Sequence, residues 1–207
     1  MNLPNKLTLI RFALCFVVLI LMVLPYNAMG WDCLPLGNTG FNLIDLLCCF
    51  FFIVASFTDM LDGKIARKYN LITDFGKFMD PLADKALVNT SLVLLGIYKP
   101  YLMPAAVVVL FIVRDLAVDG LRFVASAKGQ VIAANKYGKL KTVLQMVAIP
   151  FIFLNGFPFT YVSPLGAQIF CYILISLALV MSLISGCIYI YNGRNIIFPK
   201  KGEEEQK

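Results

Sequence analysis

The sequence of 207 residues contains no histidine and few charged residues. Without histidine the chain cannot form a Ser-His-Asp triad, a Cys-His pair, a His-ligated metal site or a histidine proton shuttle. Only 14% of the residues are charged and 60% are hydrophobic, whereas soluble domains average about 25% and about 45–50%. A soluble fold of this length has too little interior for so much apolar surface, so the composition predicts an integral membrane protein.

The six cysteines show no C-x-x-C spacing, and most of them lie in apolar runs. This pattern favours small packing residues over a disulfide scaffold or a zinc site. Any acid-base or phosphate chemistry must therefore be carried by carboxylates, lysines and arginines.

Long uncharged runs predict the membrane spans, because a transmembrane helix needs about 20 mostly apolar residues. The two middle spans reach that length only by including charged residues at one end. We expect an all-α protein with six transmembrane helices, near residues 9–25, 41–62, 78–98 and 101–122, and two within 142–193 on either side of a Gly- and Pro-containing turn at 155–164.

The basic residues then orient these spans. All 18 lysines and arginines except Lys99 fall on the side that holds both termini, and such an excess marks the cytoplasmic side. The sequence predicts a multi-pass protein of the cell membrane, with residues 1–199 as one membrane domain and 200–207 as a charged cytoplasmic tail. The net charge of +6 is thereby explained by topology, and no nucleic-acid partner is expected.

Four aspartates are expected at the cytoplasmic ends of two spans, and ionisable residues at membrane depth mark candidate functional sites. Asp59 and Asp62 lie three residues apart, and Asp80 and Asp84 lie four apart, so each pair shares a helix face. A short loop joins the two spans, which we expect to be antiparallel neighbours that bring the carboxylates together. One or two divalent cations would relieve their repulsion, and oxygen ligands suit Mg²⁺ or Mn²⁺.

The residues between the two pairs suit a phosphate ligand. Gly63 and Ala66 leave room beside the first pair. Arg67 can bind a phosphate through its bidentate fork, and Gly76 lies four residues before Asp80. Two alternatives remain open: the aspartates cap helices and pair with nearby basic residues, or they serve a divalent-cation transporter. A transporter would place carboxylates near the bilayer midplane on several spans, whereas these four are expected at one face.

These positions resemble the signature of the CDP-alcohol phosphatidyltransferases at eight fixed positions, Asp59-x2-Asp62-Gly63-x2-Ala66-Arg67-x8-Gly76-x3-Asp80-x3-Asp84. The N-terminal segment of that family is similar to Leu3-Pro4-Asn5-x2-Thr8-x2-Arg11. The branch of the family that uses glycerol 3-phosphate is similar to Arg114-Asp115 followed by Gly138-Lys139-x-Lys141-Thr142-x2-Gln145-Met146. Asp115 stands where that branch usually has Glu.

The resemblance implies an enzyme that transfers the phosphatidyl group of CDP-diacylglycerol to glycerol 3-phosphate, giving phosphatidylglycerophosphate and CMP without a covalent enzyme intermediate. It also implies a homodimer and two Mg²⁺ or Mn²⁺ ions held by Asp59, Asp62 and Asp80, with Asp84 as the general base in possible contact with the metal. The residues expected to contact CDP-diacylglycerol are Asn5, Thr8, Gly63, Ala66, Arg67, Thr73 and Gly76. The signature alone also fits a cardiolipin-forming or inositol-phosphate-using relative.

Glycerol 3-phosphate is a dianion and requires cationic partners. Basic residues expected near cytoplasmic helix ends form our hypothesis for its phosphate pocket: Arg114, Lys139, Lys141 and Arg194. Each of them could instead contact lipid headgroups. Arg122 and Asp119, three residues apart, are expected to form a structural pair, and Asp45 is expected near the outer face, away from the site.

Overall fold

The computed structural model contains six α-helices and one short 3₁₀ helix in its described part: α1 (Leu3–Val23), α2 (Leu43–Lys68), α3 (Asp74–Tyr98), α4 (Ala105–Ala127), α5 (Lys136–Phe153), η2 (Phe159–Tyr161) and α6 (Pro164–Ile197). The structure describes the backbone of residues 3–24, 40–68, 74–130 and 135–197, and the side chains of 5–24, 40–59, 79, 82–130 and 135–194. These ranges contain no β-strand, so the predicted all-α fold is confirmed.

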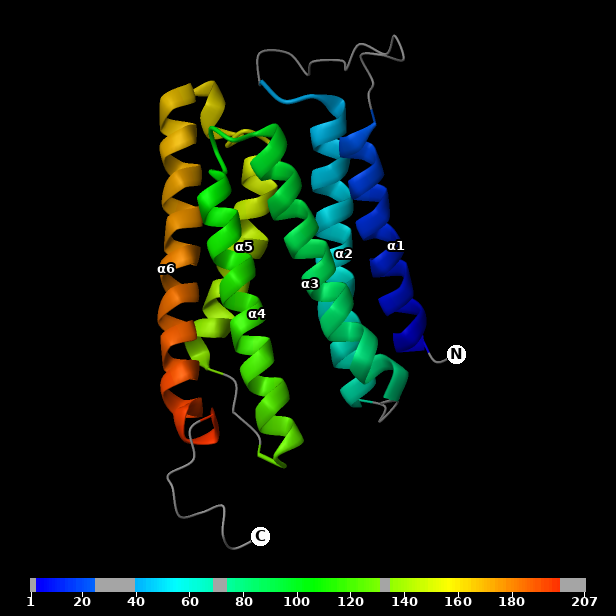
Figure 1. Ribbon diagram of the computed structural model, residues 1–207. Helices are drawn as coiled ribbons and strands as arrows, with labels where there is room; N and C mark the ends of the chain where they lie inside the picture. Colours follow the sequence, from blue (N-terminus) through cyan, green and yellow to red (C-terminus); the bar gives the residue numbers. More distant parts are fainter. Residues whose placement is uncertain (1–2, 25–39, 69–73, 131–134, 198–207) are drawn as a thin grey trace, which may run out of the picture.

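The helices form an elongated bundle (Figure 1). The lower end in Figure 1 holds the starts of α1, α3 and α5 and the ends of α2, α4 and α6. The upper end holds the α3–α4 and α5–α6 connections. We use the terms lower end and upper end in this sense throughout.

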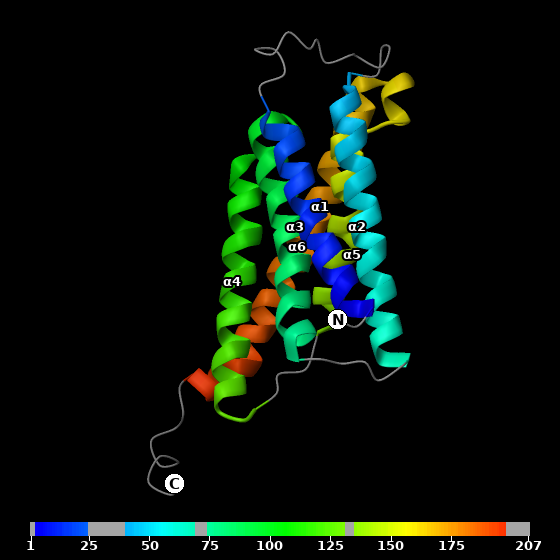
Figure 2. The same ribbon diagram turned by 90° about the vertical axis from the view of Figure 1, so that its right-hand side faces the viewer.

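Helix α1 packs along both α2 and α3, and α6 packs along both α4 and α5 (Figures 1 and 2). Helix α5 also contacts α2 and α3, which joins the two groups of helices. The sequence predicted α2 and α3 as antiparallel neighbours. They do run antiparallel and touch, but each of them packs far more extensively against α1. The first helix therefore helps to position the two helices that carry the candidate aspartates.

Two helical segments, Asn5–Val23 and Pro164–Arg194, are long and apolar enough to cross a membrane by length and composition alone. They correspond to the first and last spans expected from the sequence. The other expected spans also form helices, but within the described residues only these two pass that test.

The α5–α6 connection shows how local sequence ends one helix and starts the next. Asn155 and Gly156 follow α5 with positive φ angles of 51° and 80°, which asparagine and glycine tolerate better than other residues. A Cβ atom on Gly156 would lie 2.7 Å from Cβ of Ala167. Helix α6 then starts at Pro164, where a missing N–H costs nothing, and Ser163 accepts a hydrogen bond from the amide of Gly166.

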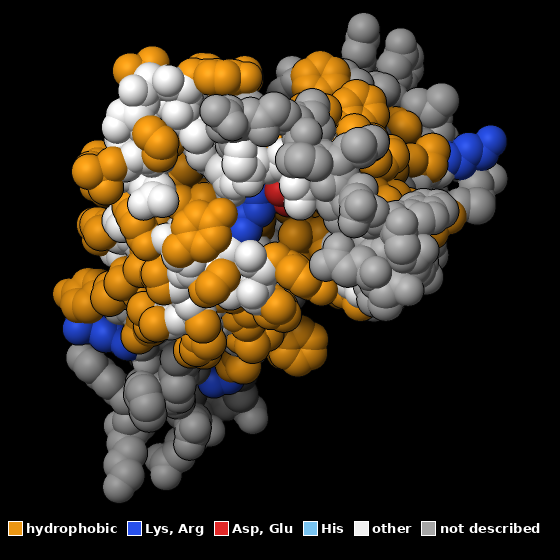
Figure 3. All heavy atoms as spheres, turned by 90° about the horizontal axis from the view of Figure 1, so that it is seen from above, with side chains coloured by type: hydrophobic (Ala, Val, Ile, Leu, Met, Phe, Trp, Pro, Cys, Tyr) orange, Lys and Arg blue, Asp and Glu red, His pale blue; other side chains and the backbone are white. Residues whose placement is uncertain are grey.

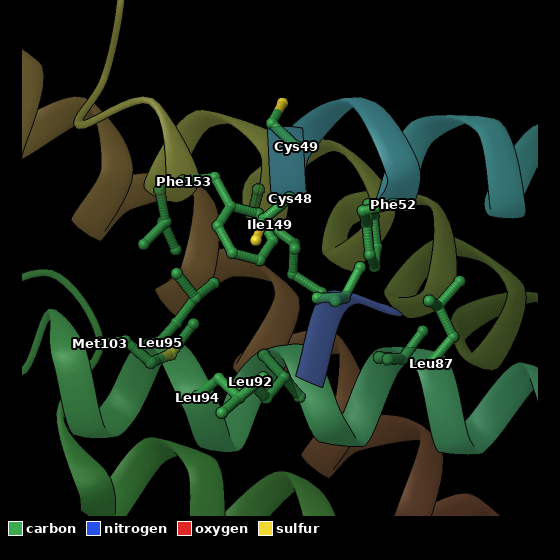
Figure 4. Packing of buried hydrophobic residues seen from close by; sticks show 14 of the residues in the cluster. Cys48, Cys49, Phe52, Leu87, Leu92, Leu94, Leu95, Met103, Ile149 and Phe153 are labelled. Atoms are coloured by element: carbon green, nitrogen blue, oxygen red, sulfur yellow. The ribbon is translucent and has the colours of Figure 1, made fainter. Parts of the chain in front are cut away.

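Apolar side chains from helices α1 through α6 fill the interior, and Figure 4 shows part of this cluster. Phe52 and Phe153, both fully buried, face each other with ring centroids 6.3 Å apart. The buried face of α1 changes along its length: its upper half contributes Cys15, Val18 and Met22, and its lower half contributes Asn5, Thr8 and Arg11. Polar groups are buried only at a cost unless they have partners, so the polar lower interior points to a functional site.

A buried ion pair ties three segments together at the upper end. Lys99 Nζ lies 3.0 Å from Oδ2 of Asp45 and donates hydrogen bonds to the carbonyl of Phe153 (2.6 Å) and to Oδ1 of Asn155 (2.8 Å). Burial lowers the pKa of Lys99, and the Asp45 carboxylate opposes that shift. Figure 3, which views this end, shows basic and acidic side chains together near the centre of the face. Asp45 therefore lies far from the candidate site, as expected.

Candidate active site

A cavity of about 240 Å³ lies between α3, α4, α5 and α6. Its lining is unusually polar for the interior of so apolar a chain. Among the lining residues are Asp84, Lys85, Asn89, Arg114, Asp115, Asp119, Arg122, Asn135, Lys139, Lys141, Gln145 and Tyr189. The structure thus brings together four residues that the sequence singled out separately, namely Asp84, Arg114, Lys139 and Lys141.

Asp84 lines this cavity and also lies near Asp59 of α2. It lies close enough to Asp59, Arg11 and Lys141 for their charges to interact with its own. Asp59 is about one-third exposed and forms a 2.5 Å ion pair with the fully buried Arg11 of α1. Sequence reasoning named Arg11 only as part of a motif. Its position could have indicated a role, because Arg11 directly precedes a long uncharged run and a charge at that depth in a membrane needs a partner.

Several predicted site residues lie outside the described side chains: Asp62, Gly63, Ala66, Arg67, Thr73, Gly76 and Asp80. The backbone does place Asp62 in α2 and Asp80 in α3, so the helical spacing of each aspartate pair holds. Among the described residues no group of three or more metal-ligating side chains occurs, since only Asp59 and Asp84 of the four belong to that set. Asn5 and Thr8 are buried on the same face of α1 as Arg11.

Asp115 is the shared counter-ion of two cavity cations. Lys141 Nζ donates to both carboxylate oxygens of Asp115, at 2.7 and 2.6 Å, and Arg114 Nη1 donates to Oδ1 at 2.9 Å. Arg114 Nε also donates to the carbonyl of Ser182 in α6 at 2.8 Å. The stem of Arg114 passes over Gly186, where a Cβ atom would lie 3.1 Å from its Cγ. Charge-assisted bonds of this kind fix side-chain geometry, so Asp115 and Gly186 hold Arg114 in place.

The cavity carries a positive formal charge. Its lining includes five basic residues and three acidic ones, a net +2. Asp119 forms an ion pair with Lys85 of α3, so the predicted pairing of Asp119 with Arg122 is wrong. Asp119 binds a lysine of the adjacent helix in place of the arginine three residues further along α4. A cavity with this balance attracts an anionic ligand.

Helix α6 contributes Tyr189 to the cavity, although the sequence did not predict it as a site residue. Arg194 of the same helix was predicted and does not line the cavity. The hydroxyl of Tyr189 accepts a hydrogen bond from the backbone amide of Asn135 at 3.0 Å, which joins α6 to the start of α5. No motif marked Tyr189, because it lies within an apolar run. The guanidinium of Arg194 lies 4.4 Å from the ring centroid of Tyr191.

The family model described as CDP-alcohol phosphatidyltransferase matches residues 1–185. The chain belongs to the CDP-alcohol phosphatidyltransferase family. The resemblance inferred from the eight signature positions is thereby confirmed. This family is membrane-embedded.

Curated relatives carry more specific names. A Bacillus subtilis protein named CDP-diacylglycerol–glycerol-3-phosphate 3-phosphatidyltransferase is 45% identical over 162 residues, which cover 78% of this chain and 81% of that protein. A Mycoplasma genitalium protein of the same name is 36% identical over 200 residues, covering 91% and 82%. A Mycobacterium tuberculosis protein named probable phosphatidylglycerophosphate synthase is 33% identical over 191 residues, covering 91% and 80%. Two of these relatives are thus named as transferases and the third as a synthase.

Proposed function

We propose that this protein transfers the phosphatidyl group of CDP-diacylglycerol to glycerol 3-phosphate and releases CMP and phosphatidylglycerophosphate. One observation carries the proposal: Asp84 of the family signature shares a cavity with Arg114, Lys139 and Lys141, which come from the segment expected to bind the acceptor. The names of the Bacillus and Mycoplasma relatives support the same acceptor.

The cationic side chains bind the phosphate of the acceptor. Lys139 has an exposed side chain at the cavity mouth, while Lys141 is 5% exposed and is held by Asp115 together with Arg114. The fixed positions of Arg114 and Lys141 favour phosphate binding, because little side-chain entropy is lost when the anion binds. Arg194 remains a prediction of the sequence, since its side chain stacks on Tyr191.

Asp84 acts as the general base. It accepts the proton of the acceptor hydroxyl while the hydroxyl oxygen forms a bond to the lipid-side phosphorus of CDP-diacylglycerol. The phosphoanhydride bond breaks at the same centre, and CMP leaves with the bonding electrons. In a chain without histidine, a carboxylate is the available group of suitable basicity.

Members of this family generally depend on divalent metal ions, and the donor set of this chain fits such ions. Asp59 and Asp84 offer carboxylate oxygens only, and Asp62 and Asp80 would add two more such groups, the ligand type that Mg²⁺ and Mn²⁺ prefer. Two bound ions would neutralise the diphosphate of the donor and polarise the reacting oxygens. The CDP group itself is proposed to contact Asn5, Thr8, Gly63, Ala66, Arg67, Thr73 and Gly76.

We further propose that all six helices cross the membrane, with both termini and the cavity mouth on the cytoplasmic side and residues 200–207 as a tail. The outward faces of α2 and α4 support this topology because they expose large apolar side chains, among them Phe50, Phe57, Val109, Val113 and Phe123. The basic residues, apart from Lys99, would then lie on the cytoplasmic side. A homodimer remains an expectation from the family.

The deciding experiment measures CMP release from CDP-diacylglycerol by the purified protein in detergent with Mg²⁺. We expect release that depends on glycerol 3-phosphate and not on phosphatidylglycerol or inositol phosphate. Release that depends on either of the other acceptors would assign the protein to a different branch of the family. Manganese uptake into proteoliposomes without CMP release would instead support the transporter interpretation.

A further inference from the structure

Gln145 forms the floor of the cavity. The buried face of α5 consists of Lys141, Gln145, Ala148, Ile149, Ile152 and Phe153, so Gln145 is its last polar member before the apolar core. Its side chain is only 2% exposed, yet it lines the cavity. Because Gln145 lies between the polar cavity and the apolar core, a ligand can contact its side chain only from the cavity.

The amide nitrogen Nε2 of Gln145 is buried and has no hydrogen-bond partner among the described residues. Two other donors that line the cavity share this property, namely Arg114 Nη2 and Asn135 Nδ2. Neighbouring groups on α5 have partners within the protein, since Lys141 donates to Asp115 and the Thr142 hydroxyl donates to the carbonyl of Gly138. A buried donor left unpaired is costly, so the three free donors point to oxygen atoms of a ligand.

We infer that Gln145 hydrogen-bonds the acceptor hydroxyl that does not react, and thereby selects an acceptor with a hydroxyl beside the attacking one. This inference rests on the proposed function and names the recognition element within the same cavity. A hydroxyl both donates and accepts hydrogen bonds, and an uncharged amide offers both partners. A phosphate only accepts, so the cationic side chains suit it better.

The order of residues along α5 fits the order of groups in glycerol 3-phosphate. Gln145 lies one helical turn, about 6 Å, further from the lower end than Lys141. Lys139 and Lys141 can therefore hold the phosphate nearer the cavity mouth. The carbon chain then extends inward, where the reacting hydroxyl meets Asp84 and the middle hydroxyl meets Gln145.

The test compares two acceptors that differ by one hydroxyl. 3-Hydroxypropyl phosphate has the same phosphate and terminal hydroxyl as glycerol 3-phosphate but lacks the middle hydroxyl. With the unaltered protein, we expect kcat/KM for the deoxy acceptor to be lower by about 10-fold or more, because it leaves the amide unpaired. In Gln145→Met, we expect kcat/KM for glycerol 3-phosphate to fall by about 10-fold, while the deoxy acceptor changes less than about twofold.

Gln168→Met is the matched control, because Gln168 lines a separate cavity at the upper end beside Tyr101. It should keep the full preference for glycerol 3-phosphate. Should Gln145→Met not be recovered folded, Gln145→Leu makes the same test, and its activity with the deoxy acceptor reports its fold. An equal fall with both acceptors, or an unchanged preference, overturns the inference. A failure of the unaltered protein to use glycerol 3-phosphate at all would refute the proposed function, a result obtained before any variant is made.

Discussion

The guanidinium of Arg11 in α1 lies 2.5 Å from the carboxylate of Asp59 in α2. Arg11 is fully buried, and Asp59 is the described carboxylate of the first signature pair. Because α1 packs against both α2 and α3, this ion pair couples the position of a candidate metal ligand to the helix beside it.

Arg11→Met should lower the free energy of unfolding by about 1–3 kcal/mol. The change breaks the ion pair and leaves a partly buried carboxylate without its cation. The one-third exposure of Asp59 lets water replace part of the lost interaction. Thermal unfolding in detergent measures the effect. Lys6→Met, on an exposed position of the same helix, should change stability little, and equal effects of the two variants would show that the ion pair contributes nothing specific.

Removal of divalent metal should abolish CMP release, and added Mg²⁺ or Mn²⁺ should restore it. Asp59→Asn replaces a carboxylate with a neutral amide and should abolish turnover even at high metal concentration, while circular dichroism shows unchanged helix content. Activity assays with EDTA and metal titration check both statements. Full turnover by the EDTA-treated, metal-free protein would refute a metal-dependent mechanism.

Asp84→Asn should lower kcat by about 10²- to 10⁴-fold, the usual contribution of a positioned general base. Binding of CDP-diacylglycerol should persist, because the other three aspartates keep their charges, so the loss appears in kcat and not in donor affinity. Calorimetry of Mn²⁺ and CDP-diacylglycerol binding to the variant makes the comparison. Donor affinity weakened as much as kcat would instead identify Asp84 as a metal ligand.

Lys139→Met should raise KM for glycerol 3-phosphate by about 10- to 100-fold, which corresponds to the loss of one charge-assisted hydrogen bond of about 1.5–3 kcal/mol. KM for CDP-diacylglycerol should stay within about twofold. Lys136→Met provides the control, since Lys136 is exposed at the start of α5 and does not line the cavity. Parallel increases in KM for both substrates would argue against a role in acceptor binding.

Gly193→Ala should destabilise the protein by about 1–3 kcal/mol through overpacking. A Cβ atom there would lie 2.6 Å from Cδ1 of Leu121, and Leu121 is itself buried against Val118 and Tyr189. A Cβ atom on Gly120 of α4 would meet nothing within 4 Å, so Gly120→Ala should be neutral or stabilising by up to about 1 kcal/mol. Similar unfolding temperatures for the two variants would contradict close packing of α4 on α6.

Hydropathy located the helices well because the apolar runs are long, but it could not set their ends. Helix α3 begins at Asp74 rather than near residue 78, since its first turns are polar and leave no hydropathy signal. Helix α4 begins at Ala105 directly after Pro104, where the expected span started at 101. The packing of α1 against both aspartate-bearing helices depends on three-dimensional contacts that no linear pattern records.

The candidate site was predictable where a residue type implied its chemistry. Asp84, Arg114, Lys139 and Lys141 stood out as charges in an apolar chain, and the structure brings them into one cavity. The partner of Lys141 was not predictable, because it comes from another helix: Asp115 of α4 binds Lys141 of α5 as well as its own neighbour Arg114. Tyr189 and the unpaired amide of Gln145 could be found only once burial was known.

The Lys99 ion pair has a mechanical consequence for the bundle. One ammonium group joins the start of α2, the α3–α4 connection and the end of α5, so the helices are clamped at the end that carries none of the candidate catalytic groups. Helices that are held together at one end can move most at their other end. A tilt of these helices about Lys99 would change the helix spacing most at the lower end, which carries the candidate catalytic groups and would admit the lipid substrate with its two acyl chains.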